Sequence, residues 1–282
     1  MSLILFVDNL SVLDCSIFDP ERGLIGESWQ VNVRLHGQPD WQGMLLDFSE
    51  VKKRLKKAID ASLDHTLLLP TRMPGLQIEA QAAQLELHYD HPNNGMHCRG
   101  PAQAFSLIDC ARCDAQSVAA HLRELLLPLL PNNLTNLEIE LVAEPIEGAY
   151  YHYSHGLKKH EGNCQRIAHG HRSRILVFKD GQRAPDAETE IAQRWQDIYL
   201  VSREDISGIE AGWLTSRYQA AQGEFAISLP LHRCDILDCD TTVEYLSATL
   251  AERLHQAAPQ HQWQVQAFEG IGKGAISLRQ PA

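Results

Sequence analysis

The feature that most constrains the fold of this chain is a pattern that occurs twice. Residues 25–33 read Ile-Gly-Glu-Ser-Trp-Gln-Val-Asn-Val, and residues 169–177 read His-Gly-His-Arg-Ser-Arg-Ile-Leu-Val in the matching place of the second half. A strand-like segment that carries a glutamate then closes each half, at residues 137–144 and 263–269. Similar segments that recur in the same order, with a period near half the chain, indicate an internal duplication.

The duplication predicts two units, residues 1–147 and 148–282. Each unit is expected to contain strands, a helix, a second pair of strands, another helix and a last strand. In the first unit these elements are expected at residues 3–13, 28–35, 48–63, around 91–95, 116–127 and 137–143. This order predicts an α+β fold in which helices pack on one face of each antiparallel sheet.

Two shorter segments carry local signals. The pair Asn94-Gly95 is a turn signal and favours a hairpin between residues 85–89 and 104–108. Residues 52–57 form a basic run, but apolar residues recur around it at helical spacing. We therefore interpret the run as the exposed face of an amphipathic helix and not as a binding patch.

Composition excludes several classes of protein. The 282 residues include 25 basic and 36 acidic side chains, and the resulting net charge of −11 disfavours binding to nucleic acid or to an anionic membrane. The longest apolar stretches, such as residues 125–130, are too short to span a bilayer, and residues 1–7 lack the pattern of a signal peptide. Seven cysteines without such a signal disfavour a disulfide framework. We expect a cytoplasmic globular protein.

The strongest chemical signal is a group of histidines with one cysteine. His155, Cys164, His169 and His171 lie within a short stretch of the second half. Catalytic zinc sites use three protein ligands and favour imidazole nitrogen. Because residues i and i+2 of a strand point to the same face, His169 and His171 can meet one ion. The pattern predicts a zinc site with His155 as the third ligand.

Alternatives to this ligand set remain open. His152 and His160 flank the motif and could replace His155, although His155 follows the aromatic residues Tyr151 and Tyr153 in the more suitable spacing. Cys164 could be a fourth ligand instead of a base. The pair Cys110-x-x-Cys113 has no second such pair to complete a four-sulfur site, so we interpret it as structural.

Together these motifs resemble a known family. The aromatic segment that ends at His155, the spacing Cys164-x4-His169-Gly170-His171, and a last strand that ends at Glu269 are similar to the 6-pyruvoyltetrahydropterin synthase and 6-carboxytetrahydropterin synthase family. In the first half, residues 43–52 followed by Ser62-Leu63-Asp64-His65 resemble the family's stretch that leads to its catalytic Asp-His pair. The resemblance covers most of both halves but is poor at residues 70–111 and 182–231.

The resemblance implies two tandem T-fold units and an active site shared between units. Family members form rings in which one subunit's zinc and cysteine meet residues of a neighbour. By this resemblance the second unit would supply Cys164 and the zinc ligands, and the first would supply Asp64 and His65. It also implies that the chain forms homo-oligomeric rings of T-fold units.

Each half departs from the family in a complementary way. The first half has Ile25-Gly26-Glu27 in place of the His-Gly-His motif, and only Asp14 or Cys15 near the place of the first histidine. The second half has no Asp-His pair after residues 199–205. We therefore expect one zinc site per chain.

The substrate implied by the resemblance is 7,8-dihydroneopterin triphosphate or a close pterin. Its conversion to 6-pyruvoyl- or 6-carboxy-tetrahydropterin with loss of triphosphate is a lyase reaction, and one branch of the family serves queuosine biosynthesis. Glu269 or Glu144 would bind the pterin ring through a bidentate contact. Thr241 and Thr242, at the expected start of the last helix, complete the candidate substrate site.

Two other functions fit the same residues. The chain could be a retired relative that binds a pterin or purine without turnover, or a non-catalytic subunit whose zinc stabilises an interface. The presence of Cys164, Asp64 and His65 favours catalysis, because a binding protein has no need of a thiol beside an Asp-His pair.

Overall fold

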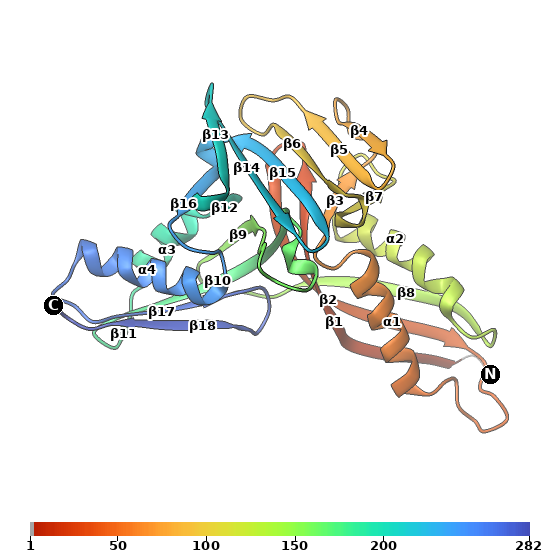
Figure 1. Ribbon diagram of the computed structural model, residues 1–282. Helices are drawn as coiled ribbons and strands as arrows, with labels where there is room; N and C mark the ends of the chain where they lie inside the picture. The colour runs from red at the N-terminus through yellow and green to blue at the C-terminus, as the bar shows by residue number, and fades with distance from the viewer. Residues whose placement is uncertain (1–2) are drawn as a thin grey trace.

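A computed structural model describes residues 3–282 of the protein, so the first two residues of the unit expected at 1–147 lie outside the described range. In this range the chain forms three sheets and four α-helices. Figure 1 shows the first sheet with α1 and α2 on one side of the molecule, the second sheet with α3 and α4 on the opposite side, and the third sheet above both. The helices are α1 (Phe48–Ser62), α2 (Ala115–Leu126), α3 (Pro185–Arg194) and α4 (Val243–Ala257).

The first two sheets have a common strand order. The first runs β7-β3-β1-β2-β8 and the second runs β16-β12-β9-β10-β17-β18, with β11 paired to β10. The strands of the first sheet are β1 (Leu3–Asp19), β2 (Gly23–Gly37), β3 (Leu67–Pro70), β7 (Phe105–Ile108) and β8 (Leu134–Ala143). Those of the second are β9 (Tyr150–His155), β10 (His169–Lys179), β11 (Gln182–Arg183), β12 (Ile198–Ser202), β16 (Cys234–Leu237), β17 (Trp263–Phe268) and β18 (Gly274–Arg279).

The register of the strands agrees with this common order. β3 runs parallel to β1 with Leu67 opposite Ser16, and β12 runs parallel to β9 with Tyr199 opposite Ser154. At the same edge of each sheet one more strand is parallel: β7 pairs with β3 in the first sheet, and β16 pairs with β12 in the second. The remaining ladders of these two sheets are antiparallel. The two sheets therefore share one arrangement of strands.

The third sheet joins the two halves. Its order is β13-β14-β15-β6-β5-β4, and β15 pairs with β6 across the halves. Its strands are β4 (Gln77–Gln81), β5 (Gln84–Tyr89), β6 (Met96–Pro101), β13 (Ile206–Glu210), β14 (Trp213–Ala220) and β15 (Gly223–Pro230). Residues 77–101 and 206–230, which lie within the segments that match the family poorly in sequence, therefore form one common sheet.

The hairpin expected between residues 85–89 and 104–108 is wrong. β5 pairs with β6, where Leu87 lies opposite Cys98, and residues 105–108 form β7, which runs parallel to β3. The turn signal Asn94-Gly95 does lie between two paired strands, but the second of them begins at once, at Met96. β6 ends in Gly100 and Pro101, and because these residues are uncommon within strands, the sequence of β6 resembles that of a loop.

The helices cover the sheets as their apolar spacing predicts. In α1, Val51, Leu55 and Ile59 are buried against the first sheet, while the basic residues between them are exposed. The Asp47 side chain accepts a hydrogen bond from the Ser49 N–H and caps the helix. The predicted amphipathic helix is confirmed. None of the helices in residues 3–282 combines the length and apolar character needed to cross a bilayer.

The two halves cross at very close range. The Ser16 and Ser154 hydroxyls share a hydrogen bond of 2.7 Å. A Cβ atom on Gly26 would lie 1.9 Å from the Tyr153 carbonyl oxygen, and one on Gly170 would lie 2.6 Å from the Gly26 Cα. Glycine is needed at both positions because the backbones approach each other directly. This crossing brings β1 and β2 against the strands that carry the candidate zinc ligands.

Candidate active site

Three buried histidines meet at the paired ends of β9 and β10. His155 lies opposite His169 in the antiparallel register, and His171 follows two residues later on the same face of β10. One nitrogen from each imidazole lies within 4.8 Å of the others. The Nε2 atoms of all three rings are buried and have no hydrogen-bond partner. Buried polar atoms without partners are rare, so three of them in one place mark a site for a ligand.

Hydrogen bonds on the other side of the rings orient two of these histidines. His155 Nδ1 lies 3.0 Å from both the carbonyl oxygen and the hydroxyl of Thr241, and His169 Nδ1 lies 3.0 Å from the Arg166 carbonyl oxygen. Because a carbonyl only accepts, both rings carry their proton on Nδ1, which leaves Nε2 free to bind a metal. Partners of this kind are typical of histidines that bind zinc.

His171 has a different partner. Its Nδ1 lies 3.2 Å from the Asp14 carboxylate oxygen, which comes from β1 in the first half. The contact satisfies the distance of an ion pair but not the angle of a well-aligned hydrogen bond. The first half thus reaches the candidate metal site at this point.

Burial keeps two of the imidazoles neutral. It lowers the pKa of His155 and that of His169 well below the usual 6.5, and the neighbouring histidines lower both pKa values further. A metal binds only the neutral imidazole, so these rings are ready for an ion at neutral pH without loss of a proton. Three imidazole nitrogens that converge in a buried site fit Zn²⁺, with a fourth position left for a substrate atom.

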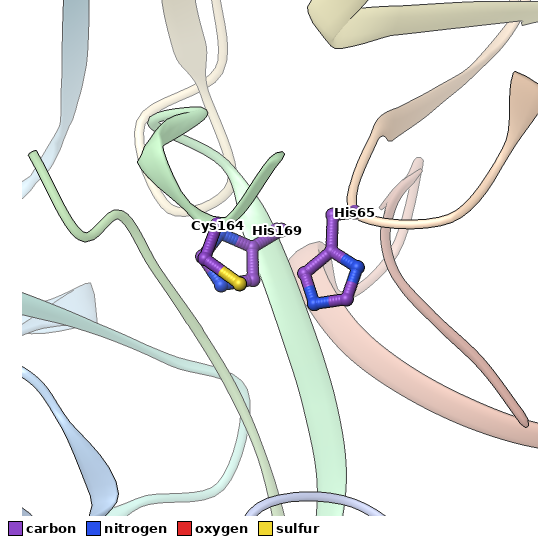
Figure 2. Close-up of side chains that lie close together, drawn as sticks. All are labelled: His65, Cys164 and His169. Carbon is purple, nitrogen blue, oxygen red and sulfur yellow. The ribbon is translucent and has the colours of Figure 1, made fainter. Parts of the chain in front are cut away.

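A thiol and an Asp-His pair lie beside the histidines. Cys164 sits in the short 3₁₀ turn Asn163–Gln165, before β10, while His65 follows α1 in the first half. One donor atom from each of His65, Cys164 and His169 lies within 4.8 Å of the others. Figure 2 shows the three side chains converging from different segments of the chain. The ring centroids of His65 and His169 are 5.1 Å apart.

The Asp-His pair is held in a fixed geometry. His65 has a left-handed φ of 56°, and its Nδ1 lies 2.6 Å from the Asp64 carboxylate. Burial lowers the pKa of His65, but its hydrogen bonds to Asp64 and Cys164 outweigh this effect and raise the pKa to about 10. His65 is therefore a cation next to the thiol at neutral pH.

The two candidate glutamates lie on different faces of β10. Glu269 lies 3.8 Å from the Lys273 ammonium, which in turn lies 3.3 Å from Asp14 beside the histidines. Glu144 instead pairs with Arg174, whose side chain points to the opposite face from His171. The structure therefore brings Glu269 to the site and leaves Glu144 in an ion pair elsewhere.

Thr241 and Thr242 both contact other groups of the protein in this structure. Thr241 is buried and contacts His155, as described above. Thr242 caps α4, where its side chain accepts a hydrogen bond from the Tyr245 N–H. Thr241 thus borders the histidine cluster, whereas the Thr242 hydroxyl stabilises the start of the helix.

The flanking histidines do not join the cluster. His152 Nδ1 lies 2.7 Å from the Gly26 carbonyl oxygen and 3.1 Å from Glu27, in the contact between the halves. His160 accepts a hydrogen bond from the Gly162 N–H in the loop before Cys164. His155 is therefore the histidine of β9 that meets His169 and His171.

In the described part of the first half, the places of His155 and His169 hold no metal donor. By register, Ile17 and Ile25 occupy the places that His155 and His169 occupy in the second half. We expected Asp14 or Cys15 near the place of the first histidine, but the extended pairing of β1 with β2 puts Ile17 there. After α3, Asp197 takes the left-handed position of His65 and binds Arg22. An ion pair therefore involves the residue of the second half that corresponds to His65.

Sequence patterns did not identify three residues of the site. Asp14 and Lys273 contact each other beside His171, and Arg166 is buried between the halves, with its guanidinium near the Asp64 and His65 carbonyl oxygens. An acidic residue between the apolar residues Leu13 and Cys15 is the one signal that could have marked Asp14. Lys273 and Arg166 stand in loops and carry no such signal.

The fold and the site together define the class of the protein. Mixed α+β architecture with largely antiparallel sheets and few helices is consistent with the T-fold class. A family model described as 6-pyruvoyl tetrahydropterin synthase matches residues 15–152, a region that contains Asp64 and His65 and ends before His155. The matched region is similar to this family.

Solved structures give a more distant likeness. The 6-pyruvoyltetrahydropterin synthase of Plasmodium vivax is 21% identical, with a TM-score of 0.40, over 52% of this chain and 94% of its own. That of Plasmodium falciparum is 20% identical, with a TM-score of 0.41 and the same coverage. Comparison with curated proteins gives no match.

Proposed function

We propose that the protein is a zinc-dependent lyase that converts 7,8-dihydroneopterin triphosphate to 6-pyruvoyl- or 6-carboxy-tetrahydropterin with loss of triphosphate. The observation that carries this proposal is the meeting of His65 from one half with Cys164 and His169 from the other. A base, a proton relay and a metal site within reach of one substrate carbon are what such an elimination needs. The family match supports the pterin substrate.

In this proposal His155, His169 and His171 hold the zinc ion, which when bound acts as a Lewis acid on the substrate's side-chain oxygens. Cys164 accepts the proton from the adjacent carbon, because the cationic His65 stabilises the thiolate beside it. Asp64 holds His65 through Nδ1 and directs Nε2 toward the site. Glu269 binds the amino group of the pterin ring. Thr241 borders the histidine cluster through its contact with His155.

We further propose that the chain is a tandem pair of T-fold units, 1–147 and 148–282, that divide one active site between them. Copies of the chain then assemble into a ring. β18 is the last strand of the second sheet, and its exposed Ile276 and Leu278 offer an edge for pairing with another copy.

Turnover of dihydroneopterin triphosphate by the zinc-loaded protein, followed by chromatography of the pterin products, tests the function. Cys164→Ala is expected to lower turnover by about 10²–10⁴-fold while zinc stays bound, because the base is lost and the ligands are kept. Asp64→Asn should lower it as well, although Asp64 lies in the other half. Cys234→Ala, which removes another partly buried thiol, should leave turnover unchanged.

Two outcomes would contradict the proposal. If the zinc-loaded protein binds the pterin tightly but forms no product, the chain is a binding protein. If turnover persists after both Asp64→Asn and His65→Ala, the two halves do not share the active site.

A further inference from the structure

Asp14 contacts groups from both halves of the candidate site. Its carboxylate is buried on β1, where it accepts a hydrogen bond from the Ser28 hydroxyl and lies 3.2 Å from His171 Nδ1. The second carboxylate oxygen lies 3.3 Å from the Lys273 ammonium. Burial of a carboxylate is costly, so one held at this place by three partners indicates a specific role.

The main chain of Asp14 holds the Asp-His pair as well. Its N–H donates to the Asp64 carboxylate at 3.1 Å, and its carbonyl accepts from the His65 N–H at 2.7 Å. One residue thus fixes the position of the proton relay through its backbone and touches a candidate zinc ligand through its side chain. Movement of Asp14 would disturb both sets of groups together.

His171 differs from the other two histidines in the group that faces its Nδ1 atom. His155 and His169 have carbonyl oxygens that accept their Nδ1 protons, whereas Nδ1 of His171 faces the Asp14 carboxylate at 3.2 Å. An acceptor at this nitrogen sets the tautomer and turns Nε2 toward the metal. A carboxylate also strengthens the imidazole as a ligand, which a carbonyl does less well.

We propose that Asp14 is a positioning residue that holds His171 as a zinc ligand from the other half of the chain. The metal site, and not only the proton relay, then depends on the contact between the halves. This inference rests on the zinc site of the proposed function, but it does not depend on the substrate or on the reaction.

Zinc affinity measured by competition with a chromophoric chelator tests the inference without any pterin. Asp14→Asn keeps the size of the side chain and removes its charge, and we expect it to weaken zinc binding about 10–100-fold. Asp19→Asn is the matched control, because Asp19 is equally buried on the same strand but pairs with Arg112 at 2.7 Å. We expect the control to bind zinc as the unchanged protein does.

The absorption spectrum of the Co²⁺-loaded protein gives a second readout. The d–d bands of cobalt report the geometry and strength of its ligands, so Asp14→Asn should shift them while Asp19→Asn does not. A purely structural role of Asp14 would lower stability without a change in the spectrum of the folded fraction. Unchanged affinity and spectrum in Asp14→Asn would overturn the inference, as would an equal loss in Asp19→Asn.

Ser28→Ala is a second variant that tests the inference if Asp14→Asn does not fold. It removes the hydroxyl that orients the Asp14 carboxylate and should weaken zinc binding in the same direction but to a smaller extent. If only this variant folds, wild-type zinc affinity in it overturns the inference. If Asp14→Asn weakens zinc binding but the unchanged protein forms no pterin product, the role of Asp14 is supported and the proposed lyase is refuted. If the unchanged protein turns over the pterin and Asp14→Asn binds zinc with undiminished affinity, the lyase is supported and the role of Asp14 is refuted.

Discussion

Replacement of Gly26 by alanine tests how strictly the crossing of the two halves fixes the active site. The new Cβ would lie 1.9 Å from the Tyr153 carbonyl oxygen and 2.5 Å from the His171 backbone nitrogen. The Cβ atoms of folded proteins essentially never approach other heavy atoms closer than about 3.0 Å. The backbones must therefore separate by about 1 Å. Both obstructing atoms belong to the main chain of β9 and β10, which carry His155, His169 and His171.

The energetic cost follows from this rigidity. Overpacking usually costs about 1–3 kcal/mol, and we expect about 3 kcal/mol here because no flexible side chain can move aside. That is a large part of a typical stability of about 5–15 kcal/mol. For a chain of this size it corresponds to a fall of about 5–10 °C in melting temperature.

Denaturant unfolding and zinc competition, measured on the same samples, check the prediction. Gly208→Ala is the matched control, because Gly208 also lies in a strand but a Cβ there meets nothing within 4 Å. We expect the control to change stability by less than about 0.5 kcal/mol. Wild-type stability and zinc affinity in Gly26→Ala would refute the claim that the close crossing holds the site together.

Two further predictions concern the metal-free protein and the assembly. Burial keeps the pKa of His155 and that of His169 well below 6.5 in the folded chain. As the pH falls below about 6.5, these histidines therefore bind protons in the unfolded chain but not in the folded one. The chelator-treated protein should lose stability in this pH range. The raised pKa of His65 acts in the opposite sense only above pH 6.5, so melting curves between pH 6.5 and 5 exclude its contribution. The lowered pKa of the half-buried His121 acts in the same direction as those of His155 and His169, and a flat profile would contradict the neutral state of these histidines. If the copies form a ring, light scattering should give a multiple of 31.6 kDa, and the mass of a single chain would argue against the assembly.

Much of the architecture could be predicted from periodicity and turn signals. The helix expected at 48–63 is observed as Phe48–Ser62, and the helix expected at 116–127 as Ala115–Leu126. Both have a cap and an apolar stripe, which are local properties that a sequence reveals. The four-residue strand β3 was not predicted separately, because all of its residues are buried and it is too short to show a period.

The chemistry of the site was partly predictable for the same reason. His169 and His171 stand at strand spacing and His155 follows alternating aromatic residues, and the structure does bring the three histidines together. Asp14 and Lys273 were not anticipated, because their contacts depend on how one sheet crosses another and not on any repeating spacing. The pairing of β6 with β15 was missed for that reason too.

The sheet that joins the halves has a consequence for the synthesis of the chain. β6 is complete early, but β15, its partner on one side, comes from residues 223–230 and leaves the ribosome much later. Until then the nascent chain presents the open edge of β6, a template for pairing with other chains. Truncated chains that end before β15 should therefore aggregate. Chaperone demand during translation should be highest in this interval.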